Sequence, residues 1–164
     1  MVTHYSLLSE AGTTRDVPNP FFYVSSSEWN LYDYLNDFFR HNKLPEGTFL
    51  LGQIKQWFQL LKTGKTQHDG KLVRVLRILE AFPNQKFVLM GDNSQRDPAI
   101  YSSIAHKYPE KIFAVYIRNI VRANEPATEA LLSGLAEKGV HTCLFEFNSE
   151  AIKHSRAIGL ITTD

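Results

Sequence analysis

The 164-residue chain has little cysteine: Cys143 is the only one, so no intrachain disulfide can form. A lone cysteine is typical of a reducing compartment, and we predict a cytoplasmic location. The first residues, MVTHYSLLSEAG, have neither a basic start nor an apolar core, so we expect no signal peptide. Because no run of about 18 apolar residues occurs, we expect at most peripheral contact with a membrane.

Neither sign of charge dominates the sequence, which has 18 Lys and Arg against 17 Asp and Glu. A net charge of +1 argues against binding nucleic acid or acidic membranes through bulk charge. Walker A, GxGxxG, HExxH and GxSxG motifs are all missing, which removes the common signatures of nucleotide binding, zinc peptidases and serine hydrolases. A globular enzyme or binding domain remains.

Apolar runs alternate with amphipathic stretches along the chain, and the length suits one domain over residues 1–164. Nearly continuous apolar strands separated by helices are typical of a parallel sheet covered on both faces, so we predict an α/β fold. In such sheets, ligands bind at the carboxyl ends of the strands. We expect strands over 21–25, 48–52, 86–90, 112–117 and 141–147, and helices over 28–41, 53–62, 70–81, 98–107, 126–138 and 149–159.

The segment GDNSQRD places two carboxylates, Asp92 and Asp97, in a loop directly after the strongest predicted strand. Mg²⁺ prefers oxygen ligands and commonly takes one or two carboxylates, with water and substrate phosphate completing its shell. This spacing indicates a metal site. The alternative is an ordinary helix start, in which Asp97 or Ser94 accepts hydrogen bonds from free backbone N–H groups.

Two further positions are candidates for phosphate binding. Ser25 is at a predicted strand end with Ser26 and Ser27 behind it, and a hydroxyl beside the N–H groups of a helix start can hold a phosphate oxygen. Lys71 begins a predicted helix, where a cation is unfavourable to the helix dipole unless an anion binds there. The alternatives are that Ser27 caps the following helix and that Lys71 is an ordinary solvated lysine.

Two amphipathic stretches have structural interpretations. Trp29, Tyr32, Leu35 and Phe39 recur at helical spacing, and we expect them to pack in the core. Gln53–Lys65 mixes aromatic residues with lysines, which suits a membrane surface or an ordinary amphipathic helix.

Three blocks occur in an order and spacing that is more specific than any one of them. The blocks are NPFFYVSSSEWNLYDYL (19–35), KLVRVLRILEAFP (71–83) and KFVLMGDNSQRDPAIY (86–101). Over residues 5–120 they closely resemble the catalytic domain of actin patch protein 1 type phosphatidate phosphatases, a branch of the haloacid dehalogenase superfamily. The resemblance implies a three-layer Rossmann-like parallel sheet, a Mg²⁺ cofactor and a phosphorylated lipid or small-molecule substrate.

The resemblance also implies roles for individual residues. Ser25 would hold the substrate phosphate, Lys71 would neutralise its charge, and Asp92 would bind Mg²⁺ with Asp97 in support. Ser26 and Asn93 lie in the same blocks and are predicted to join the phosphate site. The sequence departs mildly from the family where Glu28 replaces a usual proline and where Asn93-Ser94 replaces a usual Ser-Gly. The usual histidine directly before the lysine is also replaced, by Gly70.

A more serious departure is that no Asp-x-Asp occurs in the sequence. In the superfamily, an Asp-x-Asp-x-Thr segment supplies the attacking carboxylate and the general acid. Its strand is the usual first central strand, expected between those at 21–25 and 86–90. A preceding segment or another chain supplies that strand, or the strands at 21–25 and 86–90 pair directly with each other; we favour a truncated gene product.

We predict a phosphatase-like domain that is inactive as this isolated chain. The alternatives are a non-catalytic phosphate-binding or interaction module and, more weakly, a receiver-like domain with Asp92 as phosphoacceptor.

Overall fold

The structure is a computed structural model that describes residues 2–13, 16–52 and 69–162. The helix predicted over 53–62 and the amphipathic segment Gln53–Lys65 lie outside these ranges. None of the helices in the described ranges combines the length and apolarity that crossing a membrane requires.

Contacts divide the chain into two compact units, and the boundary falls within one helix, α4 (Asp69–Ala81). The first unit is Met1–Val75 with Leu160–Asp164, and the second is Leu76–Gly159. The single domain expected over 1–164 stays a prediction.

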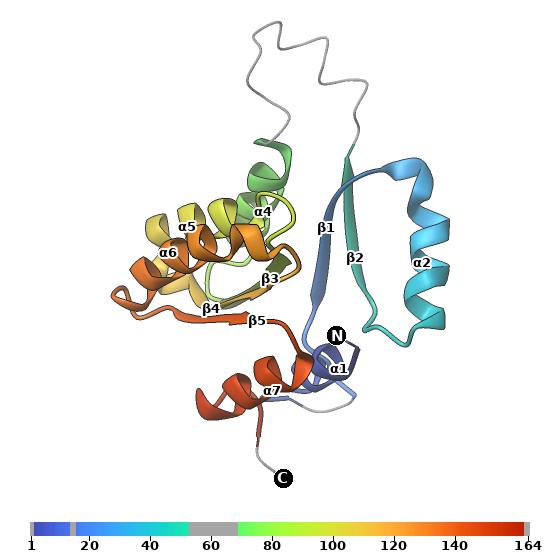
Figure 1. Cartoon of the computed structure of the whole chain (residues 1–164). Helices are drawn as coiled ribbons and strands as arrows, with labels where there is room; N and C mark the ends of the chain where they lie inside the picture. Colours follow the sequence, from blue (N-terminus) through green and yellow to red (C-terminus); the bar gives the residue numbers. More distant parts are fainter. Residues whose placement is uncertain (1, 14–15, 53–68, 163–164) are drawn as a thin grey trace, which may run out of the picture. The chain divides into compact units, whose positions relative to one another are not determined.

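The first unit contains a short parallel sheet. Its strands β1 (Phe21–Glu28) and β2 (Gly47–Gly52) pair in parallel, from Phe21 opposite Gly47 to Val24 opposite Leu50. Parallel neighbours need a crossover connection, which here runs through the 3₁₀ turn η1 (Trp29–Leu31) and helix α2 (Tyr32–His41). Figure 1 shows α2 alongside β2. Helix α1 (Val2–Ser9) precedes the sheet in the chain.

Aromatic rings join α2 to this sheet. Phe39 lies 4.5 Å from the ring of Tyr23 and 5.0 Å from that of Phe49, measured between ring centroids. Leu35 and Phe39 are partly buried as predicted, but Tyr32 is 47% exposed, so its expected core position is wrong. The predicted helix over 28–41 begins only at Tyr32, because β1 and the 3₁₀ turn take up the residues before it.

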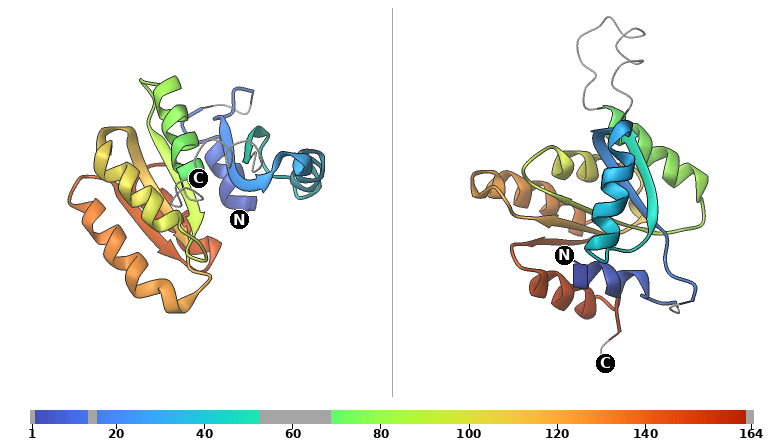
Figure 2. Two further views of the ribbon diagram at one scale, coloured as in Figure 1. Left: turned by 90° about the horizontal axis from the view of Figure 1, so that it is seen from above. Right: turned by 90° about the vertical axis from the view of Figure 1, so that its right-hand side faces the viewer.

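The second unit holds a three-stranded parallel sheet in the order β3-β4-β5. Helices α5 and α6 lie side by side on one face of it, and α7 covers the other (Figures 1 and 2). This arrangement confirms the predicted α/β class with parallel strands. The elements are β3 (Phe87–Asp92), α5 (Asp97–Lys107), η2 (Pro109–Lys111), β4 (Ile112–Arg118), η3 (Arg122–Asn124), α6 (Glu125–Ala136), β5 (His141–Phe145) and α7 (Asn148–Ala157).

The central strand β4 forms the core of the second unit. Four consecutive residues, Ala114 to Ile117, have no exposed surface, because helices cover both faces of the sheet. On the α7 side, the Tyr116 hydroxyl shares a 2.6 Å hydrogen bond with the Ser155 hydroxyl and lies 2.9 Å from His154 Nδ1. This polar contact fixes α7 against the strand that leads to the candidate site.

The His154 contact predicts a pH-dependent stability. Burial, with a smaller contribution from His141, holds the pKa of His154 below its ordinary value, so the folded state favours neutral imidazole. The unfolded chain therefore binds more protons as pH falls below about 6.5, and this part of the stability, complete above that pH, is lost on acidification. When the pH is lowered from 7.5 to 5.5, the melting temperature of His154→Gln should fall less than that of the unchanged protein. Exposed His41→Gln is the control, and equal slopes for all three proteins would contradict the assignment.

Candidate functional site

Asp92 is the last residue of β3, opposite Arg118 at the end of β4. Its Oδ1 accepts hydrogen bonds from the backbone N–H of Ser94 at 2.8 Å and from the Ser94 hydroxyl at 2.5 Å. These bonds orient the carboxylate, while its Oδ2 has no hydrogen bond to any residue that the structure describes. The Asp92 side chain is partly exposed, so this second oxygen is available to a cation.

Asp97 is the first residue of α5 and is only 7% exposed. It packs directly on Gly91: a Cβ atom at position 91 would lie 2.8 Å from Asp97 Cβ and 2.9 Å from its Cγ. Such distances leave no room for a side chain, so the glycine before Asp92 is what lets Asp97 lie there. Pro98 is in the first helical turn, as predicted. Arg96 occupies the N-cap of α5 without a side-chain hydrogen bond, and the alternative that Ser94 or Asp97 accepts from the free N–H groups stays a prediction.

Asn93 ties the loop after β3 to the loop after β4. Its side-chain N–H groups donate to Asn119 Oδ1 at 2.6 Å and to the Val121 carbonyl at 3.0 Å. Its Oδ1 accepts from the backbone N–H groups of Ile120 and Val121 at 2.8 and 2.9 Å. Both hydrogens and both lone pairs of the amide are thus used, and Asn93 is 1% exposed. We therefore assign it to ordering these loops rather than to the proposed phosphate site.

The loop after β4 carries further polar side chains. Asn119 Nδ2 donates to Glu125 Oε2 at 2.9 Å, and Asn124 Nδ2 donates to the Asn93 carbonyl at 2.7 Å. A pocket of about 260 Å³ adjoins this loop, lined by Asn119, Leu144, Phe145 and the four glutamates Glu125, Glu129, Glu146 and Glu150. The acidic lining does not suit a phosphate, and the sequence analysis did not predict the four glutamates as site residues.

The residues in the second unit that could hold a metal ion are Asp92 and Asp97, and their chemistry suits magnesium rather than zinc. Within the described ranges, no three His, Cys, Asp or Glu side chains are grouped so that they could hold a metal ion. Mg²⁺ does not need such a cage, because one or two carboxylates with water and phosphate suffice. Asp92, with an oriented carboxylate and one open oxygen, is a donor of that kind, and Asp97 lies against the residue before it.

Cys143 on β5 is partly buried. Burial, together with the nearby Glu150, raises the pKa of its thiol to about 11, so the thiol is protonated at neutral pH.

The phosphate-binding candidates Ser25, Ser26 and Lys71 belong to the first unit. Ser25 is partly buried and lies within β1, which continues three residues further than the predicted strand. Ser26 follows in the same strand, and its side chain lies outside what the structure describes. Lys71 is in the first turn of α4 and is partly buried, in agreement with the predicted helix start. Asp92, Asn93 and Asp97 belong to the second unit.

Arg74 is a neighbour of Ser25 that sequence analysis missed. Its Nη1 donates a 3.3 Å hydrogen bond to the Ser25 carbonyl, although 49 residues separate the two. The only signal in the sequence is the spacing of three from Lys71, which puts both cations on one side of α4.

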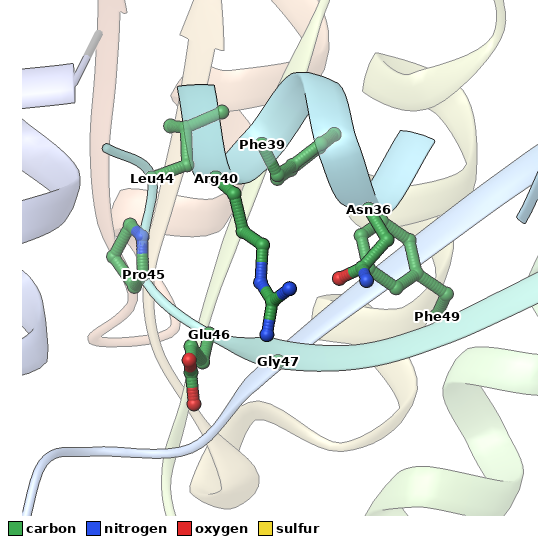
Figure 3. A pocket seen from close by; sticks show the side chains of 8 residues that line it. All are labelled: Asn36, Phe39, Arg40, Leu44, Pro45, Glu46, Gly47 and Phe49. Atoms are coloured by element: carbon green, nitrogen blue, oxygen red, sulfur yellow. The ribbon is translucent and has the colours of Figure 1, made fainter. Parts of the chain in front are cut away.

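A smaller pocket of about 140 Å³ lies between the end of α2 and the start of β2 (Figure 3). Figure 3 shows Arg40 extending from α2 toward Glu46 and Gly47, with Phe39 and Phe49 forming an apolar wall. The pocket is at the amino end of β2, whereas α/β sheets bind ligands at carboxyl ends. None of the predicted site residues lines it.

Comparison with known proteins shows which family the chain resembles. Residues 1–119 match the family described as "Phosphatidate phosphatase APP1, catalytic domain". The chain is 33% identical over 107 residues to the Saccharomyces cerevisiae protein "Phosphatidate phosphatase APP1", covering 65% of this chain and 18% of that protein. It is 29% identical over 101 residues to an uncharacterised Schizosaccharomyces pombe protein, covering 60% of this chain and 16% of that one. The chain thus spans less than a fifth of these curated relatives.

No solved structure matches the chain significantly. The family match covers well over half of the sequence and includes all three blocks on which the resemblance rests. The chain therefore belongs to the family of phosphatidate phosphatase APP1 catalytic domains.

Proposed function

We propose that this chain forms part of a magnesium-dependent phosphatase domain that hydrolyses phosphomonoesters, with phosphatidate as the substrate class. The observation that carries the proposal is the carboxylate pair after β3. Asp92 is oriented by Ser94 with one oxygen left open among the described residues, and Asp97 is packed against Gly91. The name of the matched yeast relative supports the choice of a lipid phosphate.

The family resemblance implies a separate task for each of these side chains. Asp92 holds the cation through its open oxygen, and Asp97 supports the same loop. Bound Mg²⁺ supplies positive charge that offsets the negative charge of the phosphate. Ser25 donates its hydroxyl hydrogen to a phosphate oxygen, and Lys71 adds a second positive charge, so that the ester is positioned for attack.

The attacking carboxylate is not among these residues. We propose that it comes from an Asp-x-Asp-x-Thr strand outside residues 1–164, which completes a haloacid dehalogenase-like sheet. Two observations support this: the sequence has no Asp-x-Asp, and the chain spans only part of its relatives. Within the described residues, β1 pairs with β2 in the first unit, and β3 pairs with β4 in the second.

Turnover tests the origin of the nucleophile. We expect the isolated chain with Mg²⁺ to hydrolyse phosphatidate or an aryl phosphate negligibly, because the covalent route lacks its first carboxylate. Hydrolysis by this chain that is abolished in Asp92→Ala would show that the missing strand is not needed.

A second candidate is a non-catalytic phosphate-binding module, which the missing Asp-x-Asp favours. The two functions differ in one measurement: an extended chain that includes an upstream Asp-x-Asp-x-Thr should hydrolyse phosphatidate if the first is right. An upstream reading frame without this motif would favour the second.

Mg²⁺ binding can be tested on the chain itself. Asp92→Ala is expected to weaken Mg²⁺ binding at least about tenfold in isothermal titration calorimetry, because it removes the only carboxylate oxygen assigned to the ion. Glu137→Ala, which removes an exposed carboxylate just after α6, is the matched control and should bind Mg²⁺ unchanged. If Asp92→Ala and Glu137→Ala behave alike, the metal assignment is wrong.

A further inference from the structure

Arg74 places a guanidinium group beside the strand residue assigned to phosphate binding. Its Nη1 lies 3.3 Å from the Ser25 carbonyl oxygen, to which it donates. The side chain also folds back over the first turn of α4, since a Cβ atom at Gly70 would lie 3.6 Å from Nη2 and 3.8 Å from Nη1. The guanidinium is thus held between β1 and the helix turn that carries Lys71.

This guanidinium is partly buried, and no residue that the structure describes supplies a counter-charge. Among the described residues, Arg74 forms no ion pair, and its one hydrogen bond goes to a neutral carbonyl. Burial lowers the pKa of Arg74, but an arginine stays charged at neutral pH. A guanidinium has five N–H donors, and four of them have no hydrogen-bond partner among residues 2–13, 16–52 and 69–162. Partly burying a cation is costly unless an anion pairs with it.

We propose that Arg74 is a phosphate-binding residue, which together with Lys71 binds the phosphate group of a phosphomonoester beside Ser25. This inference rests on the proposed function and adds a residue to it. The planar guanidinium can donate two parallel hydrogen bonds to two phosphate oxygens, whereas the lysine acts as a point charge. The bond to the Ser25 carbonyl pre-orients the guanidinium, so less side-chain freedom is lost when the phosphate binds.

Inorganic phosphate is the first probe, titrated into the chain and followed by ³¹P NMR. Arg74→Gln is expected to weaken phosphate binding about ten- to hundredfold, because hydrogen bonds to a charged group are lost. Arg74→Lys, which keeps the charge but not the planar fork, should weaken it less. Arg77→Gln removes an exposed arginine from the same helix and should leave binding unchanged.

A second readout separates phosphate contact from a purely structural role. Two cations favour the doubly charged form of bound phosphate more than one does. The pH at which the ³¹P signal of bound phosphate titrates should therefore rise in Arg74→Gln and stay unchanged in Arg77→Gln. If Arg74→Gln does not fold, Arg74→Lys decides: weaker binding at an unchanged melting temperature supports the assignment, and unchanged binding overturns it.

Lys71→Ala distinguishes this inference from the proposed function. If Lys71→Ala no longer binds phosphate while Arg74→Gln binds it as tightly as Arg77→Gln does, Arg74 does not contact the phosphate and the proposed function stands. If the unchanged chain does not bind phosphate, both are wrong.

The same variants are then tested on phosphatidylcholine vesicles with and without phosphatidate. A matching loss on phosphatidate vesicles extends the assignment to the lipid headgroup. Retained binding by Arg74→Gln overturns the assignment for the lipid.

Discussion

Asn93→Ala is expected to lower the free energy of unfolding of the second unit by about 3 kcal/mol. The substitution removes four side-chain hydrogen bonds between the loops after β3 and β4. The groups that bonded to the Asn93 amide then either bind water or stay unpaired. Because Asn93 is 1% exposed, no solvent takes its place without rearrangement. For a unit of this size, the melting temperature should fall by more than about 10 °C.

Circular dichroism melting with Asn84→Ala as the matched control checks this. Asn84 is exposed in the turn before β3, and its replacement should change stability by less than about 0.5 kcal/mol. A melting temperature for Asn93→Ala that equals the control would mean that the amide does not hold the two loops together. In that case the free amide would again be a candidate for phosphate binding.

Gly91→Ala is expected to cost about 2 kcal/mol of stability and to weaken Mg²⁺ binding. The new Cβ would lie 2.8 Å from Asp97 Cβ, an atom that moves only if the start of α5 moves with it. Displacing Asp97 disturbs the loop that holds Asp92, so the loss of stability and the loss of metal affinity should occur together. Melting and Mg²⁺ titration of the same sample measure both.

Gly134→Ala gives a control of opposite sign. Gly134 is inside α6, and a Cβ there would meet only the His106 ring at an ordinary 3.6 Å. Alanine favours a helix interior over glycine, so this variant should gain roughly 0.5–1 kcal/mol. If Gly91→Ala is also stabilising, the close packing of Asp97 on Gly91 does not constrain the site.

Most helices and strands of the described chain could be predicted because their patterns are local. The strand predicted over 112–117 is observed as Ile112–Arg118, and the helix predicted over 70–81 as Asp69–Ala81. Helix α1 was missed, since only His4 and Leu8 of its eight residues are buried and so short a stripe gives no clear period. The end of β1 was also misplaced, because polar serines continue the strand where the apolar pattern stops.

The family, the alternation of strands and helices, and the loop with Asp92 and Asp97 could all be read from the sequence, because they depend on residues close together in the chain. The role of Asn93, whose partners are 26 to 28 residues away, and the contact of Arg74 with Ser25 became visible only in the folded chain. Such long-range hydrogen bonds form only after the sheet brings the ends of separate strands together. Local spacing carries no information about which of these side chains will meet.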